Sequence, residues 1–142
     1  MSALERRAWL SLLGMCPGYL VYFTVQIAAP GWPGTLLGRF GFLAAVACTH
    51  AAVYLAGLAL SKLAERGQGL LADERDRTID ARATRSAYFV LLAAAILAGM
   101  VLPFINSGWN LVNAALMGIV LAEITRNALI VMGYRGTPRL AY

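Results

Sequence analysis

Four long apolar segments constrain the fold of this chain more than any other feature of its sequence. They cover residues 8–28, 40–60, 86–105 and 109–132. At a rise of about 1.5 Å per residue, each is long enough to cross the hydrocarbon core of a bilayer, which is about 30 Å thick. Because lipid offers no hydrogen bonds to the backbone, we expect each segment to be a helix. The sequence therefore predicts an all-α fold, an integral membrane four-helix bundle in which residues 1–142 form a single domain.

The composition also points to a membrane protein. Apolar residues make up 60% of the chain, and the mean hydropathy is +0.67. Soluble domains contain about 45–50% apolar residues. We therefore expect no separate soluble domain beside the four spans.

The placement of the basic residues predicts how the chain is threaded. Of its 12 Lys and Arg residues, all except Arg39 lie on one side of the membrane if both termini lie on that side. Because cytoplasmic segments carry an excess of Lys and Arg, we expect both termini and the loop over residues 61–85 to be cytoplasmic. The high pI, near 9.7, then indicates topology and contact with anionic membrane lipid. No direct binding of nucleic acid is expected.

The stretch from Asp73 to Tyr88 holds eight of the chain's 19 charged residues (12 basic plus 7 acidic). It contains neither Gly nor Pro, and most of its residues are good helix formers. Asp73 fits the N-cap position, and Glu74 and Asp76 would lie in the first turn, where the helix dipole favours negative charge. We expect one helix that begins near Asp73 and extends from the cytoplasm past Ser86 into the third apolar segment.

Acidic and basic side chains fall on two separate stripes of this predicted helix, with Ile79 and Ala83 between them. The acidic stripe comprises Asp73, Asp76 and Asp80, and the roughly opposite basic stripe comprises Arg75, Arg82 and Arg85. Three interpretations remain open: a solvated stem, a docking surface for a cytoplasmic protein, or a metal site made by the three aspartates. In the docking interpretation, Ile79 is the apolar anchor, and the charged residues meet opposite charges of the partner. The candidate partner-binding residues are Asp73, Arg75, Asp76, Ile79, Asp80 and Arg82.

Three ionisable residues lie within the apolar segments, where burying them is costly. Glu123 and Arg126, three residues apart, are expected to form an ion pair within the fourth helix. His50 is expected to be neutral and bonded to a backbone carbonyl or a hydroxyl. Counting turns from the inner ends places His50 and Glu123 at similar depth. A polar intramembrane site made by these three residues is the alternative interpretation.

Smaller features add packing expectations. Pro17 is expected to interrupt and kink the first helix. Ridges of small residues should let the helices approach closely; they comprise Ala44, Cys48, Ala52, Ala56, Ala95, Gly99, Ala114, Gly118 and Ala122. No disulfide is expected between the two cysteines, Cys16 and Cys48, and a metal site formed by them with His50 is a remote alternative. No catalytic motif or cofactor-binding motif is present, so we expect neither an enzyme nor a bound cofactor.

The second half of the chain resembles a family of small bacterial four-helix membrane proteins of unknown function. The residues that carry the resemblance are Asp73–Arg77, Ile79, Asp80, Ala83, Arg85, Ala87, Tyr88, Asn113, Leu121–Glu123, Arg126 and Tyr134–Gly136. The family's closing Tyr-Arg-Arg-Gly tail lacks its second Arg here. The resemblance covers residues 70–136 and implies a location in the bacterial cytoplasmic (inner) membrane. Members are often encoded beside small helix-turn-helix regulators, which implies a cytoplasmic partner of that kind.

Two classes of function follow from these patterns. In the first, the spans anchor a non-enzymatic interaction protein whose charged loop binds a small helix-turn-helix transcription regulator and restrains it at the membrane. In the second, the chain is a small-molecule or ion transporter or sensor that uses His50, Glu123 and Arg126, or it is an accessory subunit of a larger membrane complex. A homo- or hetero-oligomer is expected, and a transporter in particular would need one, because four short spans are few for a transporter.

Overall fold

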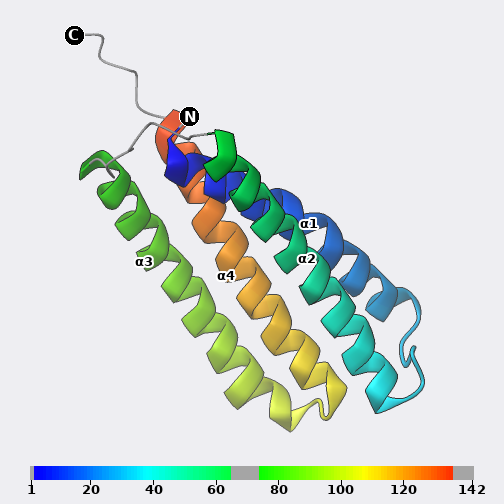
Figure 1. Ribbon diagram of the computed structural model, residues 1–142. Coiled ribbons are helices and arrows are strands. Elements are labelled where there is room, and N and C mark those ends of the chain that lie inside the picture. The colour runs from blue at the N-terminus through cyan, green and yellow to red at the C-terminus, as the bar shows by residue number, and fades with distance from the viewer. Residues whose placement is uncertain (1, 65–73, 136–142) are drawn as a thin grey trace, which may run out of the picture. The chain divides into compact units, whose positions relative to one another are not determined.

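The computed structural model describes residues 2–64 and 74–135 of the chain (Figure 1). Four of its helices are long and apolar enough to cross a membrane. They are α1 (Ala3–Ala28), α2 (Leu36–Ala64), α3 (Glu74–Ile96) and α4 (Trp109–Arg135). The predicted all-α fold with four membrane-spanning helices is thus confirmed. The chain divides into two compact units, residues 1–8 with 71–142 and residues 9–70.

In the unit of residues 9–70, α1 packs against α2 at small side chains. A Cβ placed on Gly14 would lie 3.3 Å from the His50 ring, and one placed on Gly57 would overlap Leu10. Toward the other end, the rings of Tyr22 and Phe42 stack with their centroids 5.3 Å apart. The glycines therefore set how closely these two helices approach.

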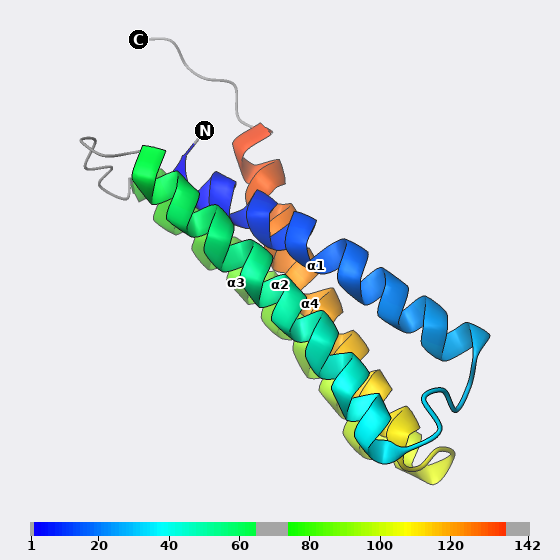
Figure 2. The same ribbon diagram turned by 45° about the vertical axis from the view of Figure 1, so that its right-hand side comes forward.

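The helix α1 is continuous from Ala3 to Ala28 (Figure 2), and Pro17 lies inside it. The predicted interruption is therefore wrong, while the kink at Pro17 stays a prediction. A proline inside a helix removes one backbone donor, but the remaining turns can keep helical geometry on both sides. At the start of α1, the Ser2 hydroxyl accepts a hydrogen bond from the Glu5 backbone N–H at 3.1 Å. This N-cap replaces a bond that the first turn cannot make within the helix.

The turn between α1 and α2 is closed by its own residues. The Thr35 hydroxyl accepts a hydrogen bond from the Gly38 N–H at 3.1 Å and so caps α2. The Arg39 side chain donates to the Pro33 carbonyl at 3.3 Å. Arg39 is the basic residue expected outside the cytoplasm, and the turn itself satisfies part of its hydrogen-bonding capacity.

In the other unit, α3 is unbroken from Glu74 to Ile96, which confirms the predicted continuation of the charged stretch into the third apolar segment. The helix then changes to a π-helical turn, η1 (Leu97–Val101), and a short 3-10 turn, η2 (Leu102–Phe104). Pro103 has no N–H to continue the α-helical pattern, which accounts for the change of geometry here. Gly108, with φ +61°, completes the reversal before α4 begins.

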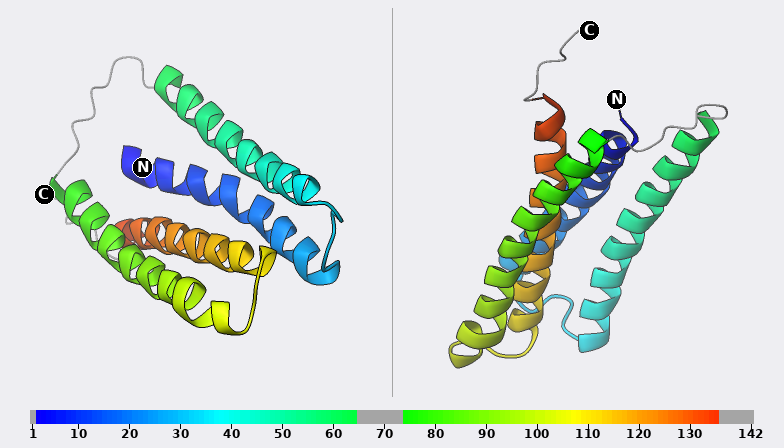
Figure 3. Two further views of the ribbon diagram at one scale, coloured as in Figure 1. Left: turned by 90° about the horizontal axis from the view of Figure 1, so that it is seen from below. Right: turned by 90° about the vertical axis from the view of Figure 1, so that its left-hand side faces the viewer.

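The helices α3 and α4 lie side by side along most of their length (Figure 3). Gly118 of α4 faces Ala94 of α3, and a Cβ on this glycine would collide with the Ala94 Cβ. Near the C-terminal end of α4, Gly133 faces Ile79 of α3. Ala83 and Ala87 of α3 are buried. Small residues thus allow close contact of these two helices, as interhelical packing in lipid favours.

The predicted ridge of α4 is used within the α3–α4 pair, while the other two ridges stay predictions. Gly118 and Ala122 are buried. Ala95 of α3, however, is exposed, and a Cβ on Gly99 of η1 would meet no atom within 4 Å. The small residues of α2 are exposed as well; they are Ala44, Cys48, Ala52 and Ala56. Spacing of four residues gives a shared helix face, but only the neighbouring helix decides whether that face is used.

Labelling of single cysteines should verify the predicted threading. In a background without Cys16 and Cys48, a cysteine at Ser2 or Thr78 should react only from the cytoplasmic side. A cysteine at Thr35, which is exposed in the turn after α1, should react from outside. The expectation rests on the excess of Lys and Arg around the first two sites. Reaction of the Thr78 variant with an impermeant maleimide added outside would reverse the assignment.

Candidate docking site at the inner ends of α3 and α4

The N-terminal part of α3 is cross-linked to the C-terminal part of α4 by polar contacts. We call these two parts the inner ends, because the charge distribution predicts that they lie on the cytoplasmic side. The Tyr134 hydroxyl donates a hydrogen bond to the Asp76 carboxylate. Asp80, one turn further along α3, forms an ion pair with Arg126 of α4. The distance between Arg126 Nη2 and Asp80 Oδ1 is 2.7 Å. Together with Thr84, these residues form what we call the polar clamp.

The pairing of Arg126 corrects the predicted ion pair with Glu123. The guanidinium group of Arg126 reaches across to α3, where its second hydrogen bond goes to the Thr84 hydroxyl at 3.2 Å. Asp80 and Thr84 are one turn apart, so they present two acceptors on one face of α3. The facing helix thus offers Arg126 both a carboxylate and a hydroxyl group.

Glu123 has a different partner. The Asn127 side-chain amide donates to the Glu123 backbone carbonyl at 2.8 Å and lies 3.4 Å from its carboxylate. Glu123 itself is exposed. The expectation that Glu123 and Arg126 act as one unit therefore does not agree with the contacts that these two side chains make.

The two aspartates of the clamp were expected to meet basic residues of a partner. In the structure their carboxylates face α4, with Asp76 on Tyr134 and Asp80 on Arg126. Asp73, the third member of the predicted acidic stripe, lies outside the described residues. Asp76 and Asp80 thus connect α3 to α4. The arginines of α3 then contribute positive charge to the rest of the α3 surface.

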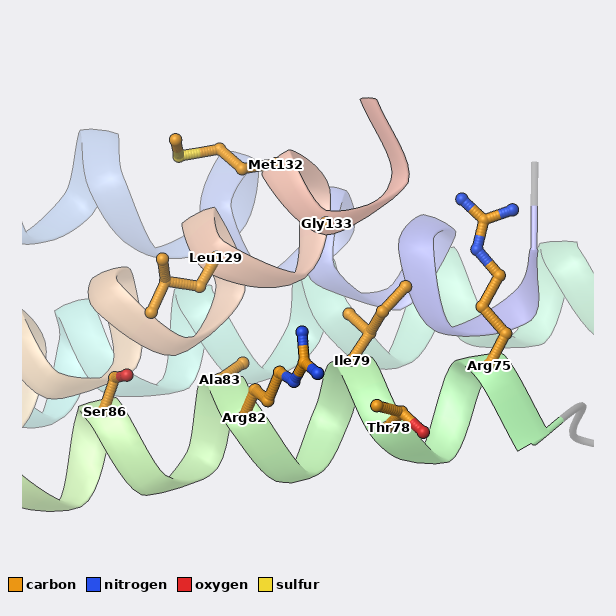
Figure 4. A pocket seen from close by; sticks show the side chains of 9 residues that line it. All are labelled: Arg75, Thr78, Ile79, Arg82, Ala83, Ser86, Leu129, Met132 and Gly133. Atoms are coloured by element: carbon orange, nitrogen blue, oxygen red, sulfur yellow. The ribbon is translucent and has the colours of Figure 1, made fainter. Parts of the chain in front are cut away.

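An open groove lies between α3 and α4 beside the clamp (Figure 4). Its volume is about 550 Å³. The residues that line it are Arg75, Thr78, Ile79, Arg82, Ala83, Ser86, Leu129, Met132 and Gly133. We refer to it as the α3–α4 groove. Of the predicted partner-binding residues, Arg75, Ile79 and Arg82 are brought together here.

The groove has a basic edge and an apolar floor. Figure 4 shows the side chains of Arg75 and Arg82 leaving α3 on the side that faces α4, with Ile79 between them. The guanidinium carbon of Arg75 lies 5.6 Å from the centre of the Tyr134 ring, a cation–π distance. None of the described residues that line the groove is acidic. The site therefore offers two positive charges beside apolar surface.

Sequence reasoning missed two members of the clamp and the α4 side of the groove. Tyr134 was named only among the residues that carry the family resemblance, and Thr84 was not singled out. One signal was available for Tyr134. In a helical hairpin, residues at similar distances from the turn lie opposite each other, and Asp76 and Tyr134 are nearly equidistant from residues 105–106.

His50 belongs to the other unit, so its predicted contact with Glu123 stays a prediction. Within residues 9–70, the His50 ring lies edge-on to the Tyr19 ring, with 6.2 Å between centroids. The hydrogen bond that we expected for His50 is not found with any described residue. Its surroundings are therefore aromatic, with the backbone of α1 close by at Gly14.

Both cysteines are free thiols, Cys16 half-buried and Cys48 exposed. Within residues 2–64 and 74–135, no group of three or more His, Cys, Asp or Glu residues is arranged to hold a metal ion. The α3–α4 groove is lined by none of the three residues of the polar intramembrane alternative. The chemical features that the structure brings together thus lie at the inner ends of α3 and α4.

Four apolar helices, with a polar clamp at the inner end of one hairpin, define a multi-pass helical membrane protein. Over residues 20–137, the chain matches the model of a family described as predicted membrane protein (DUF2178), and it belongs to that family. The matched range extends the resemblance, expected over residues 70–136, into the first two helices. No match was found among curated proteins or among solved structures.

Proposed function

We propose that this protein is a non-enzymatic membrane anchor that binds a cytoplasmic protein on the exposed face of the α3 inner end. One observation carries the proposal: α3 continues without a break from the apolar segment to Glu74 and is fastened to α4 by the polar clamp. A rigid element can present side chains with little loss of conformational entropy on binding. This is what a docking surface needs.

The exposed face of this segment has a net positive charge, with two arginines and one exposed acidic residue, Glu74. Arg77 and Arg85 are exposed and lie outside the α3–α4 groove. Because the carboxylates of Asp76 and Asp80 face α4, they do not balance this charge toward a partner. We infer that the partner brings acidic side chains to Arg77 and Arg85, and that opposite charges set its orientation.

The class of partner comes from the family resemblance. We propose a small helix-turn-helix regulator, held at the membrane and so kept from DNA. The basic face of α3 would bind an acidic surface of such a protein. An oligomer of this chain would present several copies of the same face, and the resulting avidity would strengthen the restraint.

Co-purification from native membranes tests this function. Wild-type protein extracted in mild detergent should retain a specific small protein, identified by mass spectrometry. The double variant Arg77→Glu, Arg85→Glu should retain at least roughly tenfold less of it, because like charges at an interface cost several kcal/mol. The matched control, Arg7→Glu with Lys62→Glu, changes two exposed basic residues outside α3 and should retain the partner.

Three outcomes would contradict the proposal: no specific protein in the wild-type sample, unchanged retention by the α3 variant, or equal loss in the control. Reversing one residue of the captured protein to Lys or Arg should restore binding to the Arg77→Glu, Arg85→Glu variant if the inferred charge pairing is correct.

A further inference from the structure

We propose that the α3–α4 groove binds the head group of an anionic phospholipid from the inner leaflet. The phosphate would lie at Arg75 and Arg82, and the glycerol end of the acyl chains would contact Leu129 and Met132, with Ser86 at the membrane end of the groove. The site is separate from the basic face proposed for the protein partner, so neither proposal depends on the other.

The first argument is depth. Ser86 is the first residue of the apolar segment over residues 86–105, and Met132 is the last residue of the segment over residues 109–132. Both line the groove. The groove therefore crosses the boundary between the charged inner end and the membrane, which is where lipid phosphates lie. A soluble ligand would not need a floor that continues into the apolar part of the hairpin.

The second argument is charge. Arg75 and Arg82 are seven residues apart on α3, roughly 10 Å along the helix axis, and both line the same groove. A guanidinium group can donate two parallel hydrogen bonds to a phosphate. Among the described residues, Arg82 makes no hydrogen bond or ion pair. The carboxylates of Asp76 and Asp80 on the same helix bond to Tyr134 and Arg126 of α4.

The third argument is the mixture of surfaces. Thr78 and Ser86 add hydroxyl groups, while Ile79, Leu129 and Met132 supply apolar contact. A volume of about 550 Å³ suits a head group with the beginning of its chains, because small-molecule sites commonly measure about 300–1,000 Å³. An anionic phospholipid combines a phosphate with hydrocarbon and matches both parts of this lining.

Lipid binding to the full chain tests the site. Native mass spectrometry should show the purified protein retaining phosphatidylglycerol in preference to phosphatidylcholine with the same acyl chains. The Arg75→Gln, Arg82→Gln variant should bind phosphatidylglycerol roughly tenfold or more weakly, because each basic residue near the surface contributes to attraction of anionic lipid. Its binding of phosphatidylcholine should be unchanged.

Control variants separate the groove from general charge. Arg77→Gln with Arg85→Gln removes the same charge from α3 outside the groove and should keep the lipid preference. Arg82→Gln alone, which removes no contact with a described residue, should show an intermediate loss. It keeps the test decisive if the double variant fails to fold. Arg75→Lys with Arg82→Lys keeps the charge without the planar fork and should restore part of the binding.

Several results would overturn the inference. These are an undiminished preference for phosphatidylglycerol in the groove variants, an equal loss in the Arg77→Gln, Arg85→Gln control, or occupancy by inorganic phosphate as strong as that by the lipid. Loss of a co-purified protein instead of lipid in the groove variants would assign the groove to the protein partner.

Discussion

Replacing Gly118 with Leu should destabilise the α3–α4 hairpin by roughly 3 kcal/mol, at the upper end of the usual cost of overpacking a close-fitting contact. The Cβ alone would already collide with Ala94 on the facing helix. The Ala94 Cα lies 3.7 Å from the Cβ position, already at van der Waals distance, so the larger leucine side chain has no free space on that side. The helices must separate, and contacts along their shared face weaken together.

The measurement is unfolding of the purified protein in mixed micelles with increasing denaturing detergent, followed by circular dichroism. Gly118→Ala should show a smaller loss, about 1–2 kcal/mol, because only one methyl group must be accommodated. Gly41→Leu is the matched control, since a Cβ at Gly41 meets nothing within 4 Å. Its stability should stay the same or increase slightly, because leucine favours helix over glycine. Equal behaviour of the Gly118 and Gly41 variants would contradict the close contact.

Removing either member of the Asp80–Arg126 pair should cost roughly 1–2 kcal/mol, and removing both should cost less than the sum. The two side chains are 40% and 33% exposed, so the effect should be smaller than for a fully buried pair. The single variants Asp80→Asn and Arg126→Gln each leave one partner at the edge of the membrane without its counterpart. The double variant leaves neither charge.

A double-mutant cycle on the same detergent titration measures this coupling, which we expect to be about 1 kcal/mol. The cycle of Glu123→Gln with Arg126→Gln is the matched control, since Glu123 bonds with Asn127 and Arg126 with α3. That cycle should be additive within about 0.5 kcal/mol. Strong coupling of Glu123 with Arg126, and none of Asp80 with Arg126, would show that the intrahelical pair is the correct one.

The charged stretch shows which structural features can be predicted from local sequence. Helix-forming residues without Gly or Pro from Glu74 to Ile96 predict one continuous helix, and the structure has it. Local propensity and the period of the helix suffice for this prediction. They also place Asp76 and Asp80 on one stripe of α3. Whether that stripe faces water or another helix depends on residues more than 40 positions away.

Arg126 illustrates the same limit. Its spacing from Glu123 satisfies the rule for neighbours on one helix surface, yet its guanidinium group bonds with Asp80 and Thr84. A long flexible side chain can bond with the helix that lies beside it. The spacing of residues along one helix does not predict which helix that is. The small residues show the same limit. Gly118 packs closely against Ala94 of the facing helix, whereas a Cβ on Gly99 would meet no atom within 4 Å.

The sequence by itself determined the class of this protein, the number of its candidate spans and the continuity of α3, because hydrophobic length and helix propensity are properties of single segments. Only the tertiary structure decided which charges pair within the chain and which arginines share a groove. The packing of α3 on α4 turns Asp76 and Asp80 inward and leaves Arg75 and Arg82 along an apolar floor. These contacts join residues far apart in the chain, and they depend on the register of two helices that no single segment specifies.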